Sequence, residues 1–268
     1  MSNPSFQVLV VTLNQQDLSL PEKMNLQSDA LIGNQGMPDE STYAAEYKDH
    51  RITVYSRSDR GVGINRNNLL ARADADIILL ADDDVVYDNG YPETVLRAFE
   101  EHPEADGIFF DVIPIPDTID PSLNKTWHRI RFFNCLKYGA PRLALRNSVL
   151  KEKKISFSTL FGGGAKYSSG EDSLFIADCL RSGMRLYACP ERIGSVTFDT
   201  TWFKGYDEKY FKDKGVFFYF LSNRFSRILC LQYCVRKNKL FAGEYSPLEA
   251  YRLMLKGISE YKEGAANE

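Results

Sequence analysis

The sequence lacks several features that would assign it to a broad class at once. Its five cysteines are odd in number and form no Cys-x-x-Cys pair, so we expect reduced thiols and neither a disulfide framework nor a zinc site. No uninterrupted apolar run reaches about 18 residues, so no membrane-spanning helix is expected. The N-terminus has no basic segment followed by an apolar core, and we expect no signal peptide. A net charge of −3 provides no general basic field, which argues against nucleic acid as a partner.

The pattern of apolar runs predicts an α/β fold. Hydrophobic residues make up 44% of the 268 residues, enough for a sizeable core. Short β-rich runs alternate with helical or turn-rich segments, which is typical of a mostly parallel central sheet flanked by helices. We expect the sheet within residues 1–205 and a C-terminal helical segment over 206–268. The expected strands are 6–13, 29–33, 51–55, 76–81, 107–113, 142–146, 185–188 and 193–198, and the expected helices before the tail are 65–73, 91–101, 148–154 and 169–181.

Residues 76–84 are the most informative stretch, because an apolar run there ends in three consecutive carboxylates, Asp82, Asp83 and Asp84. The run predicts a strand buried on both faces, and ligands of open α/β sheets bind at the carboxyl ends of the strands. Adjacent carboxylates repel one another unless water or a cation surrounds them. Hard oxygen ligands suit Mg²⁺ or Mn²⁺, which often complete their shell with substrate phosphates. The alternative is a solvated acidic turn after the strand.

A second candidate site follows three glycines at 162–164, where the chain continues to Gly170-Glu171-Asp172. Consecutive glycines allow the backbone to approach a ligand closely or to adopt positive φ. The two acids after Gly170 are candidates for a general base. The alternative is that both acids only stabilise a helix N-terminus through its dipole.

Together, these segments resemble the family 2 glycosyltransferases with the GT-A fold, a Rossmann-like sheet, over roughly residues 6–200. The end of the first strand, Thr12-Leu13-Asn14, resembles the family's nucleotide-contacting strand end. Gly61 to Asn67 resembles its glycine-then-Arg-Asn segment, and Arg66 precedes Asp82 by the usual family spacing. The three aspartates resemble the DxD motif, and the glycines followed by Glu171-Asp172 resemble the acceptor-side loop and ED motif.

The resemblance implies a metal-dependent, inverting transfer of a sugar from a nucleotide-diphosphate donor. Asp84 is expected to bind Mn²⁺ or Mg²⁺ directly. Asp82 and Asp83 would hold metal-bound water, ribose or donor-sugar hydroxyls, with Asp82 as a further candidate ligand. Arg66 would contact the base or the phosphates, the alternative being a surface arginine on a helix. Asp172, beside Glu171, occupies the position of the family's catalytic base.

Two departures from the family pattern affect the donor site. The histidine that many GT-A enzymes use as a late metal ligand is missing, and either Asp199 or water would replace it. Asn34 and Gln35 follow the second strand, where many relatives carry an aspartate that reads uracil. An amide can also hydrogen-bond a base, so a UDP-sugar is the expected donor although other nucleotides stay open.

Residues 216–241 interleave aromatic and basic side chains. One interpretation is a helix packed on the sheet with its basic face in water. The other is a helix at a membrane surface or facing a lipid-linked substrate. The resemblance favours a cytoplasmic hexosyl- or N-acetylhexosaminyltransferase of polysaccharide or capsule biosynthesis, peripheral on the inner face of the plasma membrane. Its acceptor would be a saccharide or lipid-linked saccharide.

Three other functions compete with this interpretation. A nucleotidyltransferase would show a glycine-rich, basic loop after the first strand, where this chain has Asn14 to Asp17. A glycoside hydrolase uses two carboxylates but does not need a triple acid directed at phosphates. A non-catalytic relative that only binds sugar nucleotides is disfavoured by the presence of both acidic motifs.

Overall fold

The computed structural model describes residues 4–115, 124–197 and 205–266. Its contacts divide the chain into two compact units. We call residues 1–160 with 171–199 the sheet unit, and residues 161–170 with 200–268 the helical unit. Residues 161–170, which the sequence analysis grouped with the sheet, therefore pack with the C-terminal helices.

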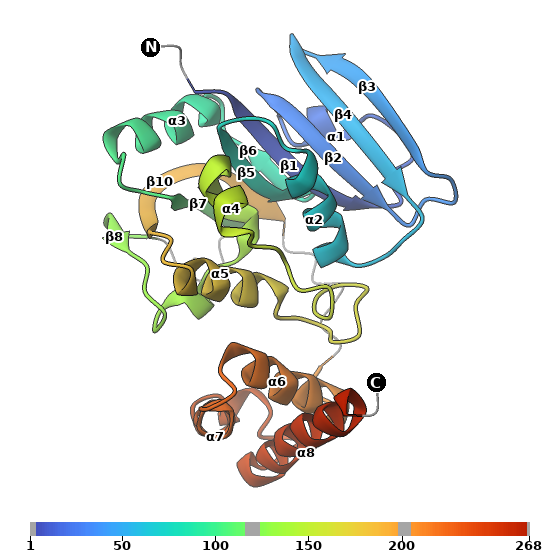
Figure 1. The fold of residues 1–268 in the computed structure, drawn as a ribbon, viewed down its shortest axis with the longest axis vertical. Coiled ribbons are helices and arrows are strands. Elements are labelled where there is room, and N and C mark those ends of the chain that lie inside the picture. The colour runs from blue at the N-terminus through green and yellow to red at the C-terminus, as the bar shows by residue number, and fades with distance from the viewer. Residues whose placement is uncertain (1–3, 116–123, 198–204, 267–268) are drawn as a thin grey trace. The chain divides into compact units, whose positions relative to one another are not determined.

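The sheet unit is built on a mixed, largely parallel sheet of ten strands among the described residues (Figure 1). The strand order is β3-β4-β2-β1-β5-β9-β7-β10-β6, with β8 paired to β10. The central strands β4, β2, β1 and β5 run parallel, whereas β9 is antiparallel to both of its neighbours. The strands are β1 (Phe6–Leu13), β2 (Asp29–Gln35), β3 (Ser41–Tyr47), β4 (His50–Arg57), β5 (Ile77–Asp82), β6 (Val85–Tyr87), β7 (Gly107–Ile115), β8 (His128–Arg129), β9 (Leu143–Arg146) and β10 (Leu186–Thr197).

Both faces of this sheet are covered by helices. Val8 and Val10 of β1 join one core cluster, and Leu9 and Val11 join the other, because successive side chains of a strand point to opposite faces. Helices α1 and α3 contribute to the first cluster, and α2, α4 and α5 to the second. Residues 77–81 of β5 alternate between the two clusters in the same way, which confirms the predicted burial of that strand on both faces. The helices and 3₁₀ turns of the unit are α1 (Leu20–Lys23), α2 (Val62–Arg72), α3 (Tyr91–Glu101), η1 (Cys135–Lys137), η2 (Ala140–Arg142), α4 (Asn147–Lys153) and α5 (Glu171–Arg181).

Two details of the sheet differ from the sequence prediction. Strand β3 was missed, because its side chains are largely exposed and show no apolar alternation. The two strands expected at 185–188 and 193–198 form one strand, β10, with irregular register between Ala188 and Gly194. Pro190 lies in that interval and has no N–H to donate, so the pairing is interrupted without ending the strand.

The helical unit contains α6 (Glu208–Leu221), α7 (Ser226–Arg236), η3 (Asn238–Leu240) and α8 (Pro247–Ala265). Residues 216–241 are thus the end of α6, α7 and η3 within this unit, so the expectation of a single helix over this segment was wrong. Helices α6 and α8 cross closely, because Gly215 lies against the carbonyl group of Met254. A capping box formed by Ser246 and Glu249 starts α8. None of the helices in the described ranges combines the length and hydrophobicity that crossing a bilayer requires.

Candidate functional site

The acid triplet lies at the carboxyl end of β5, as predicted. Asp82 is the last residue of the strand, and Asp83 and Asp84 form the turn into β6. In the parallel register Val11 pairs with Asp82, so the end of β1 lies beside the triplet. The Thr12 hydroxyl donates a hydrogen bond to the Asp83 carboxylate. The structure therefore brings the predicted nucleotide-contacting strand end and the predicted metal site together.

Arg66 connects this triplet to the predicted catalytic base. Its guanidinium donates to Asp82 Oδ1 at 2.7 Å and to Asp172 Oδ1. A Glu171 carboxylate oxygen lies 3.9 Å from the same guanidinium. Arg66 is only 4% exposed, so the alternative of a surface arginine is wrong. One buried cation thus bridges the strand end of β5 and the first turn of α5, which are far apart in the sequence.

Local packing explains why an arginine is held in this place. Helix α2 packs on β1 and β2, and Arg66 lies on its inner side with the guanidinium carbon 5.1 Å from the Phe157 ring centre. The neighbouring Asn67 fixes Phe157 through two hydrogen bonds, a side-chain donor to the Phe157 carbonyl at 2.9 Å and an acceptor for its N–H at 2.7 Å. The two neighbouring residues therefore act together, since Asn67 fixes the position of Phe157 and the Arg66 guanidinium packs against the Phe157 ring.

The charges of this cluster do not balance locally. Burial opposes the charge of Arg66, but Asp172, Asp82 and Glu171 outweigh it and raise the Arg66 pKa. Burial also raises the pKa of Asp82, against the opposing effect of Arg66. Burial and repulsion by Asp82 and Asp83 raise the pKa of Asp84 to about 6. The triplet thus carries negative charge that its protein neighbours do not fully compensate, and binding of a cation would relieve the repulsion.

Asp172 is held from two sides at the start of α5. Its Oδ1 faces Arg66, and its Oδ2 accepts a hydrogen bond from the Ala140 N–H at 2.9 Å. Ala140 begins η2, and a Cβ added at the preceding Gly139 would lie 3.4 Å from the same carboxylate oxygen. The side chain remains 24% exposed, so it is positioned by the protein and still open to solvent.

Asn34 and Gln35 lie within the end of β2 and not after it, because β2 is two residues longer than predicted. The Asn34 amide is 3% exposed and bonds both the N–H and the carbonyl of Gln15, at 2.9 and 2.8 Å. Gln35 accepts the Gly61 N–H at 2.9 Å, at the N-terminus of α2. Both amides are therefore used to hold the protein's own backbone. Asn14 has a positive φ of 55° and its N–H bonds the Gln35 carbonyl at 3.0 Å, while the Leu13 side chain is 50% exposed.

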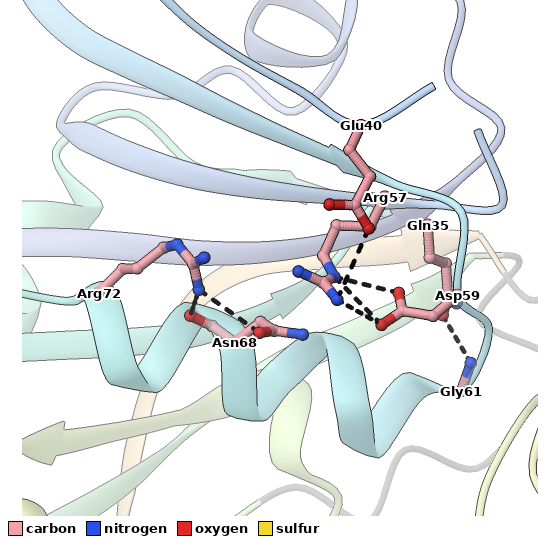
Figure 2. A network of polar contacts seen from close by, with 7 residues as sticks. All are labelled: Gln35, Glu40, Arg57, Asp59, Gly61, Asn68 and Arg72. Carbon is pink, nitrogen blue, oxygen red and sulfur yellow. Dashed lines mark hydrogen bonds and ion pairs between the residues drawn. The ribbon is translucent and has the colours of Figure 1, made fainter. Parts of the chain in front are cut away.

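Figure 2 shows a polar network, missed by the sequence analysis, that positions the loop before α2. Arg57 bonds Asp59 through two nitrogens, at 3.1 and 2.8 Å, and lies 3.9 Å from Glu40. The Asp59 carbonyl accepts the Gly36 N–H at 3.2 Å. The opposite charges of Arg57 and Asp59, two residues apart, could have indicated this ion pair from the sequence. This network fixes the approach to α2 and therefore indirectly places Arg66.

A small pocket opens beside the ends of β1, β2 and β4. Tyr43 of β3 contributes an aromatic wall that sequence reasoning did not find, because β3 itself was missed. Burial and the charge of Asp17 raise the pKa of Tyr43. The pocket is lined by Gln15, Asp17, Leu18, Leu20, Pro21, Ile32, Asn34, Tyr43 and Val54.

The predicted glycine loop belongs to the helical unit. Gly162, Gly164 and Gly170 adopt positive φ, which side chains disfavour. The loop is tied to α6 by Ser168, whose N–H and hydroxyl both donate to Asp213, at 3.0 and 3.1 Å. The glycines thus serve the conformation of this loop.

No group of three or more His, Cys, Asp or Glu side chains in the described part of the chain is arranged to hold a metal ion. The predicted ligand Asp199 lies outside the described residues. The donor set nevertheless fits a cation that a substrate helps to bind, because Mg²⁺ commonly takes one or two carboxylates and completes its shell with water and phosphates. Uncompensated charge at Asp84 is the feature that supports this fit.

Residues 31–155 match the family model described as glycosyl transferase family 2. The fold is similar to S. aureus TarS 1–349 in complex with UDP-GlcNAc, with a TM-score of 0.65 and 13% identity over 97% of this chain and 92% of that one. The fold is also similar to S. aureus TarS 1–349 in complex with UDP, with a TM-score of 0.64 and 15% identity over 96% of this chain and 82% of that one.

A longer structure of S. aureus TarS matches with a TM-score of 0.58 and 16% identity over 80% of this chain, but the match spans only 39% of that TarS chain. A comparison with curated proteins found no match. At these identities the structural likeness concerns the fold, and it confirms the GT-A architecture predicted from the sequence.

Proposed function

Because residues 31–155 match the model described as glycosyl transferase family 2, we propose that this chain is a member of that family and transfers a sugar from a nucleotide-diphosphate donor to an acceptor hydroxyl. The observation that carries the proposal is the Arg66 bridge. It holds the end of β5, where a donor's phosphates would bind, at a fixed distance from Asp172, where an acceptor would be deprotonated. Transfer requires these two functions to lie side by side.

Asp172 is the proposed general base. The acceptor hydroxyl must lose a proton as it attacks the anomeric carbon, and a carboxylate held within hydrogen-bond reach can accept it. Contacts with Arg66 and the Ala140 N–H fix the orientation of Asp172, and each carboxylate oxygen keeps capacity for a further hydrogen bond. A single base and direct attack imply inversion at the anomeric carbon. Glu171 adds negative charge beside it and is a secondary candidate.

Asp84 is the proposed direct ligand of Mn²⁺ or Mg²⁺, with Asp82 as the second candidate and Asp199 or water completing the set. When bound, the cation would neutralise charge on the departing diphosphate as a Lewis acid. Asp82 stays oriented by Arg66, and Asp83 by the Thr12 hydroxyl, so both are placed to hold water or donor hydroxyls.

The donor's base is proposed to lie over the ends of β1 and β2, next to the small pocket that Tyr43 and Gln15 help to line. Tyr43 offers a ring for stacking and the Gln15 side chain offers polar groups. UDP is the expected nucleotide, and the TarS complexes with UDP-GlcNAc and UDP support this choice. A hexose or N-acetylhexosamine would be transferred to a saccharide or lipid-linked saccharide in polysaccharide biosynthesis, on the cytoplasmic side of the membrane.

The test is release of nucleoside diphosphate from a panel of UDP-, GDP- and TDP-sugars in the presence of a glycolipid extract. Asp172→Asn should slow release by at least about 100-fold, the usual contribution of a general base, while nucleotide affinity is retained. The matched control is Asp178→Asn on the same helix, an exposed residue paired only with Arg181 among the contacts described, and it should leave turnover unchanged. Equal rates for wild type and Asp172→Asn would rule out the assigned base.

A further inference from the structure

Helix α7 carries an exposed apolar stripe. Ile228, Leu231 and Val235 are 63%, 50% and 60% exposed, and their spacing of three and four places them on one face of the helix. A different face of α7 packs inside the helical unit, since Cys230 and Cys234 are completely buried. An amphipathic helix normally turns its apolar face inward, so a second apolar face in solvent needs an explanation. Phe225 and Leu240, which flank α7 in the sequence, are also exposed, at 51% and 53%.

The same segment concentrates positive charge. Residues 214–243 contain six Lys or Arg and no Asp or Glu, in a chain whose net charge is −3. The five that follow α6, from Arg224 to Lys239, form no ion pair with any residue that the structure describes, whereas Lys256 of α8 lies between Glu208 and Glu260. The exposed basic residues around the stripe are Arg224, Arg227, Arg236, Lys237 and Lys239.

The charge decides which occupant fits this face. A second copy of the chain would bring a like-charged rim against this one, which costs free energy. An anionic bilayer instead offers acyl chains for the stripe and lipid phosphates for the rim. Binding to such an interface grows with the apolar area that enters it and with the attraction between basic side chains and anionic lipids.

We propose that α7 is a membrane-docking helix, with Ile228, Leu231 and Val235 entering the headgroup boundary of an anionic bilayer and the flanking Arg and Lys side chains at the level of the phosphates. Basic residues near an anionic surface each contribute about 1 kcal/mol, or about fivefold in affinity. Attraction between exposed charges weakens with salt, because the Debye length falls from about 10 Å at 0.1 M to about 3 Å at 1 M. This inference stands independently of the catalytic assignment, since neither the stripe nor the rim includes a proposed active-site residue.

The experiment is co-sedimentation of the full chain with vesicles of phosphatidylcholine alone or mixed with phosphatidylglycerol. We expect binding to the mixed vesicles only, with loss at high salt. The triple change Arg224→Glu, Arg227→Glu and Lys237→Glu should weaken it by about 100-fold, as the product of three fivefold effects. Ile228→Ser with Val235→Ser should weaken it while leaving the charge unchanged.

The matched control distributes the same change in net charge over the sheet unit. Lys48, Lys125 and Lys153 are exposed, and changing all three to Glu should leave vesicle binding within a few-fold of wild type. An equal loss in this control would mean that net charge and not α7 governs binding, and it would overturn the proposal. Circular dichroism and the melting temperature of each variant show whether the fold is kept.

A second measurement does not depend on the multiple variants. Leu231→Trp places an indole in the stripe, and its fluorescence should shift to the blue with phosphatidylglycerol vesicles and stay unchanged with phosphatidylcholine. An unchanged spectrum with both vesicle types contradicts the proposal. Concentration-dependent dimerisation that Ile228→Ser abolishes, without vesicle binding, would assign the face to a second copy of the chain and also overturn it.

Discussion

Replacing Arg66 by methionine keeps an unbranched apolar stem and removes the guanidinium that Asp82 and Asp172 share. Removing one partner of a buried charge pair typically costs about 3–5 kcal/mol, because the other partner stays behind without compensation. The two carboxylates are 38% and 24% exposed and keep some contact with water, so we expect the lower end, about 3 kcal/mol. For a domain of this size about 1 kcal/mol shifts the melting temperature by about 2–4 °C, which gives a loss of about 6–12 °C.

The pH dependence of the loss identifies its cause. Burial already raises the pKa of Asp82 and Arg66 acts against that rise, so the methionine variant should raise it further. A carboxyl whose pKa is higher in the folded than in the unfolded chain takes up a proton on folding at intermediate pH. Its folded form is therefore favoured as pH falls. The stability deficit of Arg66→Met should be largest at mildly alkaline pH and smaller at mildly acidic pH.

The measurement is thermal and urea unfolding of Arg66→Met and of the control Arg72→Met, each at mildly acidic and mildly alkaline pH. Arg72 lies on the same helix, is exposed, and bonds the carbonyl and side chain of Asn68 (Figure 2). Its replacement should change the free energy of unfolding by no more than about 0.5 kcal/mol, as is usual for surface positions. If the two variants are equally stable, or if the Arg66→Met deficit does not depend on pH, the assignment of Arg66 as the compensating charge is refuted.

Three further predictions concern the rest of the molecule. Gly215→Ala should destabilise the helical unit by about 3 kcal/mol, because its Cβ would overlap the α8 backbone, whereas Gly264→Ala, with open space around it, should be neutral or stabilising by up to about 1 kcal/mol in urea unfolding. Burial raises the pKa of Asp111, against hydrogen bonds from Asn124 and the charge of Arg142. The stability that the protonated Asp111 carboxyl contributes is therefore lost as pH rises. Arg142→Gln should raise the pKa of Asp111 further, and a carboxyl ¹³C NMR titration measures this. The buried cysteines have raised thiol pKa values and should not react with a thiol reagent until the chain unfolds, and rapid labelling of the native protein would contradict their packing.

The central strands could be predicted from the sequence, because each is marked by a local run of apolar, β-branched residues. Residues 6–13 form a strand with the predicted bounds, and α3 has the predicted bounds 91–101. Strand β3 gave no signal, since an exposed edge strand needs no apolar alternation. The irregular β10 was divided in two because Pro190 reads locally as a break, although pairing with β7 continues on both sides of it.

Sequence reasoning found the acids of the candidate site but not their connection. Spacing and resemblance selected Asp82, Asp172 and Arg66 separately. Nothing in the chain order indicates that one guanidinium reaches both carboxylates, since that contact depends on how α2 and α5 pack on the same face of the sheet. Likewise, the sequence analysis assigned the amides of Asn34 and Gln35 to a ligand. Their hydrogen-bond partners are backbone groups in distant segments, which the sequence does not reveal.

The most direct test of the proposed function is the thermal stability of the chain with UDP, GDP and TDP, each with and without Mn²⁺. A nucleotide present at about 100 times its dissociation constant should add about 2.7 kcal/mol to stability. We predict an increase in melting temperature with UDP that requires Mn²⁺, is lost in Asp84→Ala, and is kept in Asp74→Ala, which removes an exposed acid just before β5, at the opposite end of that strand. No shift with any nucleotide, or a shift that neither Mn²⁺ nor Asp84 affects, would contradict the proposed donor site.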